Sequence, residues 1–256
     1  MTTVINDQTI NYIVTGEGAP LLLLHGWGAE IDSFAPVTIE LSKYRKVYVI
    51  DFPGFGKSEE PKRAFEVKDF TEIVKTFIET VIGEKTDIIC HSFGGRVTIL
   101  LSSMYPELVG KIVFTDAAGI KPKRGIRYYT RVYSYKFAKK LAKTRVMKKV
   151  FRAVGFDAEK KIKNAGSEDY RKLSGTMRET FVKVVNQDLT PYLKDIKSPS
   201  LLVYGENDTD TPVRFGKIME REIRDAGLVV LEDAGHFSYL DQFPRYISIV
   251  KVFLGV

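Results

Sequence analysis

The chain has 256 residues, of which 44% are hydrophobic and 28% charged, a composition typical of a folded domain with a substantial core. Residues 1–8 are polar, and the apolar run at 19–24 is far too short to cross a bilayer, so we expect a cytoplasmic protein without a signal peptide or membrane span. One cysteine, Cys90, excludes an intramolecular disulfide and a cysteine-rich metal site.

The net charge of +7 is distributed unevenly along the chain. Residues 117–190 hold 20 Lys and Arg against 6 Asp and Glu, whereas the remainder is mildly acidic. A segment with its own charge balance indicates its own surface role. We therefore expect a core domain formed by residues 1–116 and 191–256, with residues 117–190 as a basic helical insertion.

Apolar and alternating runs predict the strands in chain order. The expected strands are residues 4–5, 9–14, 20–24, 46–50, 87–89, 112–114, 200–204 and 228–231. The expected helices are residues 32–43, 67–82, 96–104, 177–187, 213–225 and 243–254, with further helical stretches within 125–155 and near Ser167. Strands that alternate with helices predict an α/β fold with a mostly parallel sheet and helices on both faces.

The most informative segment is Cys90-His91-Ser92-Phe93-Gly94-Gly95, between a predicted strand and a predicted helix. A serine flanked by small residues at such a turn is typical of a nucleophile elbow, in which the turn lifts the hydroxyl clear of the sheet. The N–H of Phe93, at the helix start, can then stabilise an oxyanion. His91, on the strand itself, is expected to point to the opposite side of the sheet.

A serine hydroxyl needs a general base, and the chain offers three histidines. His236 follows the last predicted strand, in the loop Asp233-Ala234-Gly235-His236-Phe237, so it is the expected base. His25, in the turn His25-Gly26-Trp27-Gly28, is more simply explained by hydrogen bonds to loop backbone, although a substrate contact stays open. The N–H of Trp27 in that turn is the expected second donor of an oxyanion hole.

The acid that orients the histidine is expected to be Asp208, in the loop after residues 200–204. With Asp208 the residues occur in the order Ser, Asp, His. Its neighbour Asp210, and Asp116 at the end of another predicted strand, are the alternatives.

A phosphate-binding loop is excluded at Gly56-Lys57-Ser58. The motif requires glycine at position 51, where this chain has aspartate, and the acidic residues at 59–60 would repel phosphate. No recognition motif accompanies the basic insertion, so nucleic acid is not an expected partner.

Together these motifs resemble the α/β-hydrolase superfamily, in its serine-nucleophile, carboxylesterase-like branch with a helical cap. The similarity also includes the run from Asp51 to Ser58 and covers nearly the whole chain. It implies an eight-stranded sheet with the cap inserted after the sixth strand, where the basic segment falls. The chain departs from the family at Cys90, where glycine is usual, which affects the packing of the elbow more than its chemistry.

The resulting hypothesis is a serine hydrolase that cleaves carboxylic esters through Ser92, His236 and Asp208, with no metal and no cofactor. One alternative is a C–C bond hydrolase or lyase that uses the same triad on a carboxylated substrate. A second is a non-catalytic module that senses a ligand or binds a carrier.

The basic insertion is expected to determine which small-molecule ester is bound. Tyr129 and Tyr133 are its expected substrate contacts, and its tyrosines lie between lysines and arginines. A solvated basic helix that covers the site with its aromatic face explains this pattern most simply. Recognition of an acidic or carrier-bound substrate, or contact with a membrane surface, are the alternatives.

Overall fold

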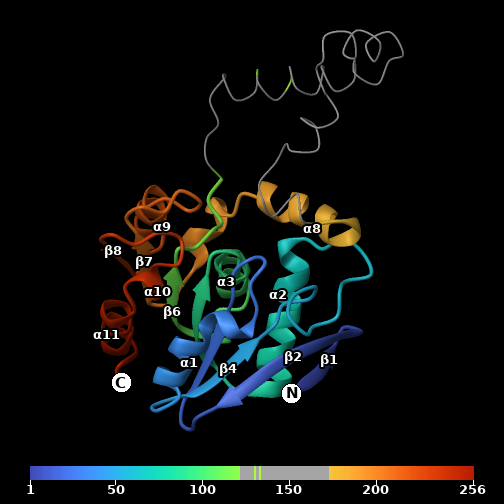
Figure 1. The fold of residues 1–256 in the computed structure, drawn as a ribbon, viewed down its shortest axis with the longest axis horizontal. Coiled ribbons are helices and arrows are strands. Elements are labelled where there is room, and N and C mark those ends of the chain that lie inside the picture. Colours follow the sequence, from blue (N-terminus) through green and yellow to red (C-terminus); the bar gives the residue numbers. More distant parts are fainter. Residues whose placement is uncertain (122–129, 131–132, 134–172) are drawn as a thin grey trace, which may run out of the picture. The chain divides into compact units, whose positions relative to one another are not determined.

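The computed structural model describes residues 1–121, 130, 133 and 173–256. It divides into two compact units, one formed by residues 1–121 and 179–256 and the other by residues 122–178. All strands of the sheet belong to the first unit (Figure 1). Most of the predicted insertion, including Tyr129, lies outside the described residues.

Eight strands form a single sheet in the order β1-β2-β4-β3-β5-β6-β7-β8, and all pairs from β4 to β8 are parallel. Only the pairs β1–β2 and β2–β4 are antiparallel. The strands are β1 (Thr2–Ile5), β2 (Gln8–Thr15), β3 (Pro20–Leu24), β4 (Lys46–Ile50), β5 (Thr86–His91), β6 (Val109–Thr115), β7 (Ser200–Gly205) and β8 (Ala226–Leu231). The prediction of a mostly parallel α/β sheet is confirmed.

The helices of the described residues connect and cover these strands (Figure 1). They are α1 (Ala35–Leu41), α2 (Val67–Phe77), α3 (Phe93–Met104), α8 (Gly175–Asn186), α9 (Arg214–Glu222), α10 (Ser238–Asp241) and α11 (Phe243–Leu254). Shorter helical turns are η1 (Ile31–Phe34), η2 (Ile78–Ile82) and η3 (Thr190–Asp195). The helix α2 runs directly into η2, as expected for the predicted helix over residues 67–82.

Strand β3 is buried on both faces because helices cover both sides of the sheet. Leu21 and Leu23 share one core cluster with residues of α1 and α11. Side chains alternate along a strand, so Leu22 and Leu24 face the other side. On that side α2 and α3 pack side by side and α3 contacts β5 (Figure 1). The continuous apolar run of this strand follows from burial on both faces.

The largest differences from the predicted elements concern the helix expected over residues 32–43 and an additional short helix. The predicted helix over 32–43 is split, because residues 31–34 form the 3-10 turn η1 and α1 begins only at Ala35. Pro36 occupies the first turn of α1, where its missing N–H is tolerated, so Asp32 does not cap this helix. The short α10 (Ser238–Asp241), next to the last helix, was not predicted because four residues carry no periodic pattern.

Candidate active site

Ser92 lies in the sharp turn between β5 and α3, with backbone angles of φ 46° and ψ −107°. A non-glycine residue rarely adopts a positive φ, and such strain is often found at functional sites. The turn is tight because Gly94 lies against the end of β3. A Cβ atom at Gly94 would lie 2.2 Å from the carbonyl oxygen of Leu24. The elbow therefore depends on glycine at this position.

His236 lies beside the serine, although 144 residues separate the two in sequence. The Ser92 hydroxyl donates to His236 Nε2 at 3.0 Å, and His236 Nδ1 donates to Asp208 Oδ2 at 2.8 Å. Ser92, His236 and Asp208 follow β5, β8 and β7 respectively. The carboxyl ends of these parallel strands bring the three predicted residues into one hydrogen-bonded chain.

Asp208 is buried and accepts hydrogen bonds on both carboxylate oxygens. Its Oδ1 accepts from the N–H of Asp210 at 2.8 Å and of Thr211 at 3.0 Å. Its Oδ2 accepts from His236 and from the Thr211 hydroxyl at 2.6 Å. Burial alone would raise the pKa of Asp208, but the bonds from His236 and Thr211 outweigh it and lower the pKa to about 2. Asp208 is therefore a carboxylate at neutral pH.

The charge of Asp208 in turn stabilises a proton on His236. Partial burial lowers the pKa of His236. The hydrogen bond from His236 to Asp208 and the charge of Asp208 raise this pKa by more than burial lowers it, so the net shift is upward. An imidazole that holds a proton readily, and that accepts a hydrogen bond from a serine, is suited to general-base catalysis.

The other two candidate acids have different surroundings. Asp210 is exposed, and its backbone N–H rather than its carboxylate contacts Asp208. Asp116 is completely buried, and its carboxylate accepts from Gly205 and Ser238. Among the described residues, His236 Nδ1 is therefore bonded to Asp208 and Thr211 and to neither alternative.

Trp27 and Phe93, the predicted oxyanion donors, lie on turns that contact each other. Gly94 donates its N–H to the carbonyl oxygen of His25 at 3.1 Å, which ties the elbow to the turn after β3. The Trp27 and Phe93 rings pack edge to face with centroids 5.3 Å apart. Within the part of the chain that the structure describes, the N–H groups of both residues lack a hydrogen-bond partner. Both donors therefore remain open to an incoming oxygen atom.

The rings of Trp27 and Phe93 belong to an aromatic cluster on this side of the serine. Trp27 also packs against Phe55 and Phe181, with centroids 4.9 and 5.1 Å apart. Phe93 contacts Phe52 at 5.1 Å and several further rings. These edge-to-face contacts hold the two donor turns together and give the site an apolar flank.

His25 does not offer a polar atom to a ligand, in contrast to the substrate contact that the sequence left open. Its ring is fully buried. Nδ1 donates to the carbonyl oxygen of Gly26 at 2.7 Å, and Nε2 accepts from the N–H of Phe52 at 3.0 Å. Burial lowers the pKa of His25 to about 4, so the ring is neutral. The side chain supports the turn that carries Trp27.

The prediction that His91 points away from the serine side is wrong. Its Nε2 donates to the backbone carbonyl of His236 at 2.7 Å, and the two rings lie 4.9 Å apart. Burial, followed by the neighbouring His236, lowers the pKa of His91 to about 3. His91 is thus a neutral support for the histidine loop. Sequence alternation failed here because the last residue of β5 leads directly into the strained turn.

The other residues singled out in the sequence lie outside the hydrogen-bonded chain of Ser92, His236 and Asp208. Cys90 is buried, and burial raises the pKa of its thiol to about 12, which makes it a poor nucleophile. Asp51 accepts from the N–H groups of Ile31 and Lys57, so its carboxylate ties the loop at residues 51–58 to η1. Tyr133 is exposed and belongs to the second unit.

Two carboxylates and the ring of His236 form a cluster of atoms that metal ions commonly bind. Ligand atoms of Asp208, Asp210 and His236 lie within 4.8 Å of one another, and this is the single such group among the described residues. Both imidazole nitrogens are already used, by Asp208 and by Ser92. The geometry therefore fits the hydrogen-bonded chain better than a metal site.

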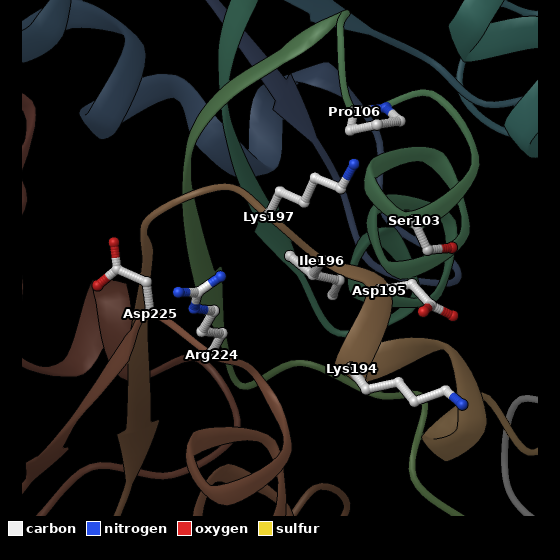
Figure 2. A pocket seen from close by; sticks show the side chains of 8 residues that line it. All are labelled: Ser103, Pro106, Lys194, Asp195, Ile196, Lys197, Arg224 and Asp225. Atoms are coloured by element: carbon white, nitrogen blue, oxygen red, sulfur yellow. The ribbon is translucent and has the colours of Figure 1, made fainter.

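A separate pocket of about 820 Å³ lies at the opposite edge of the sheet. Lys197, just before β7, and Arg224, just before β8, line it together with acidic side chains of both segments (Figure 2). Strands β7 and β8 begin at this edge and end at the edge that carries Asp208 and His236. This pocket is therefore distinct from the candidate site.

Sequence reasoning missed the contribution of Thr211. Its hydroxyl lies 2.6 Å from Asp208 Oδ2, 3.2 Å from His236 Nδ1 and 2.8 Å from the carbonyl oxygen of Asp116. A threonine three residues after an aspartate is a local signal, because Asp, Ser and Thr side chains often bond nearby backbone in turns. The contacts to His236 and Asp116 have no such signal.

Residues 19–243 match the model of the alpha/beta hydrolase fold family, and the chain belongs to that family. The resemblance deduced from the sequence motifs is thus confirmed. Among the described residues, no helix is long and apolar enough to span a bilayer.

The similar proteins carry the names of different hydrolases. The chain is 26% identical to a pimeloyl-[acyl-carrier protein] methyl ester esterase of Wigglesworthia glossinidia brevipalpis, with 94% of this chain and 96% of that protein covered. It is 24% identical to a 2-hydroxymuconate semialdehyde hydrolase of Pseudomonas sp. (strain CF600), with 94% and 88% covered. The crystal structure of an enol-lactonase from Burkholderia xenovorans LB400 has the same fold, with a TM-score of 0.75, 21% identity and full coverage of both chains.

Proposed function

We propose that the protein is a serine hydrolase that cleaves carboxylic esters through a covalent acyl-enzyme. The observation that carries this proposal is the hydrogen-bonded chain from Ser92 through His236 to Asp208. The unpaired N–H groups of Trp27 and Phe93 complete the set of groups that acyl transfer requires.

In the first step His236 Nε2 removes the proton of Ser92 as the serine oxygen attacks the ester carbonyl carbon. The carbonyl oxygen becomes an oxyanion, which the N–H groups of Trp27 and Phe93 stabilise. Each such donor typically contributes on the order of 10²–10³ in rate. His236 then donates its proton to the leaving alcohol as the C–O bond breaks, which leaves an ester between Ser92 and the acyl group.

In the second step a water molecule takes the place of the alcohol. His236 removes one proton from this water, and the hydroxide attacks the acyl carbon. Collapse of the second oxyanion releases the carboxylic acid and returns the proton to Ser92. Asp208 stays ionised throughout and stabilises the imidazolium that forms in each half of the cycle.

We propose a small-molecule ester as the substrate. More specifically, we propose that this ester is acidic or is bound to a carrier. The basic composition of residues 117–190 supports this form, since that segment contains 20 Lys and Arg residues but only 6 Asp and Glu residues. A relative named as a methyl ester esterase for a carrier-bound acyl group supports it as well.

A second candidate function is hydrolysis of a C–C bond in a carboxylated substrate. It is favoured by the relative named 2-hydroxymuconate semialdehyde hydrolase and by the fold shared with a meta-cleavage product hydrolase of Pseudomonas fluorescens. The two functions differ in the leaving group and use the same serine, so the triad alone does not separate them.

The test is hydrolysis of p-nitrophenyl esters from acetate to dodecanoate by the wild type and by Ser92→Ala. Ser103→Ala is the matched control, because Ser103 lies in α3 away from the site and, within the described part of the chain, its hydroxyl bonds only the carbonyl oxygen of Leu100. Turnover that is lost in Ser92→Ala and retained in Ser103→Ala supports the proposal. The optimal chain length then measures the size of the acyl site.

The same proteins are then assayed with 2-hydroxymuconate semialdehyde. If the enzyme hydrolyses this compound faster than every ester tested, C–C hydrolysis rather than ester hydrolysis is its main function. A wild type that turns over neither class, yet binds such a compound in calorimetry, would overturn the enzymatic proposal in favour of a ligand-sensing module.

A further inference from the structure

Asp116 is a buried carboxylate that the proposed reaction does not use. It follows β6 with a φ of 44°, a left-handed conformation that is uncommon outside glycine. Its side chain is completely buried, and burial raises its pKa to about 7 against the opposing hydrogen bonds of Ser238 and Gly205. Backbone strain and a buried acid are both unfavourable for folding, which suggests a function beyond packing.

The carboxylate connects two separate loops. Asp116 Oδ1 accepts from the N–H of Gly205 at 2.8 Å. Its Oδ2 accepts from the N–H of Ser238 at 3.0 Å and from the Ser238 hydroxyl at 2.6 Å. All three partners are donors, so the site requires a group that accepts on both oxygens.

The two residues that bond the Asp116 carboxylate are close in sequence to Asp208 and His236. Gly205 is three residues before Asp208, and Ser238 is two residues after His236. The Thr211 hydroxyl also lies between the acid and Asp116, 2.6 Å from Asp208 Oδ2 and 2.8 Å from the backbone carbonyl oxygen of Asp116. Asp116 thus holds the acid loop at two points and the histidine loop at a third.

We propose that Asp116 is a positioning residue for the hydrolysis: its carboxylate ties the Asp208 loop to the His236 loop and so keeps His236 aligned between Asp208 and Ser92. This inference rests on the proposed function, because the alignment matters only where His236 acts as the base. Small displacements of a catalytic group lower the rate strongly, since proton transfer requires a short and well-aligned path.

Asp116 also acts on His236 through its charge. The charged groups that act on His236 are Asp208, which is bonded to it, and Asp116 and Asp210, and all three raise its pKa. His91 packs against the ring but is neutral. Because the pKa of Asp116 is itself about 7, its charge is present on the neutral and alkaline side of the acid limb. Loss of that charge should lower the pKa of His236 and move the acid limb of kcat/KM to slightly lower pH.

The test variant is Asp116→Asn, assayed on the best p-nitrophenyl ester at a temperature well below its Tm. An asparagine amide has one acceptor oxygen, so its NH₂ group must lie opposite the N–H of either Gly205 or Ser238. The hydrogen bond to that loop is then lost. We expect kcat to fall by about 10–100-fold with KM within about threefold, as for the loss of one or two buried hydrogen bonds. The acid limb should shift to lower pH.

The matched control is Asp87→Asn, at the opposite edge of the sheet. The carboxylate of Asp87 likewise accepts from two donors, the N–H of Lys111 and the guanidinium of Arg45, each at 2.6 Å. This variant should lower Tm and leave kcat and the acid limb unchanged. An Asp116→Asn enzyme that behaves in the same way, with kcat within twofold of wild type, would overturn the proposal.

Two further measurements keep the proposal testable. If Asp116→Asn does not fold, Ser238→Ala removes one of the three bonds and keeps the charge. It should lower kcat by about 3–10-fold without a shift of the acid limb, and an unchanged kcat would overturn the proposal. If the wild type hydrolyses no ester, the proposed function fails by itself. NMR titration of His236 then tests Asp116 independently, because an unchanged pKa of His236 in Asp116→Asn would overturn its action on the base.

Discussion

The substitution Asp208→Asn tests the proposed mechanism most directly, because the structure determines which way the new amide must point. Oδ1 of Asp208 accepts from the backbone N–H groups of Asp210 and Thr211. An amide can satisfy both donors only with its carbonyl oxygen at the Oδ1 position. Its NH₂ group then occupies the Oδ2 position and donates to Nδ1 of His236.

In this arrangement Nδ1 of His236 becomes an acceptor, so the neutral ring carries its proton on Nε2. That proton lies between Nε2 and the Ser92 hydroxyl, where the wild type has a lone pair. The serine loses its base while the geometry is retained. Wrong-tautomer variants of such triads lose about 10⁴ in kcat, so we expect a loss of about 10³–10⁴, or about 4–5 kcal/mol of transition-state stabilisation.

The assay is steady-state hydrolysis of the best p-nitrophenyl ester, with kcat and KM determined separately. KM should change little, because Asp208 is buried behind His236 and contacts no substrate. The matched control is Asp210→Asn, which removes the same charge from an exposed neighbour two residues away and should leave kcat within about threefold. A kcat of Asp208→Asn within tenfold of wild type would refute the assignment of Asp208 as the orienting acid.

Three further predictions concern the elbow. Ser92→Gly should be more stable than Ser92→Ala by about 1 kcal/mol in urea unfolding, because glycine relieves the positive φ; equal stability would mean that the turn is unstrained. Gly94→Ala should lower the free energy of unfolding by about 3 kcal/mol in the same assay, because the new Cβ atom would overlap the backbone of Leu24. The control Gly227→Ala, with open space around it, should lower this free energy by less than about 0.5 kcal/mol. Cys90 should resist a thiol reagent in the native state and react after unfolding, and rapid native reaction would contradict its burial.

The sequence alone predicted the strands, the mostly parallel sheet and most of the helices. Strand β3 could be predicted from its run of leucines, and the hairpin turn at Asn6–Asp7, where both residues have positive φ, from its turn residues. The places of Ser92, Asp208 and His236 directly after predicted strands led to the expectation that these three residues would meet. These inferences succeed because burial on both faces, turn chemistry and strand ends leave local patterns in the sequence.

Only the tertiary structure decided what surrounds those residues. His91 contacts the His236 loop across 145 positions of sequence, and Asp116 reaches Gly205 and Ser238 across 89 and 122 positions. Such contacts join loops that meet at one edge of a sheet, and nothing in either loop's own sequence specifies its partner. The sequence determined the chemical groups and the strand ends that carry them, and the packing of the strands decided which hydrogen bonds hold those groups in place.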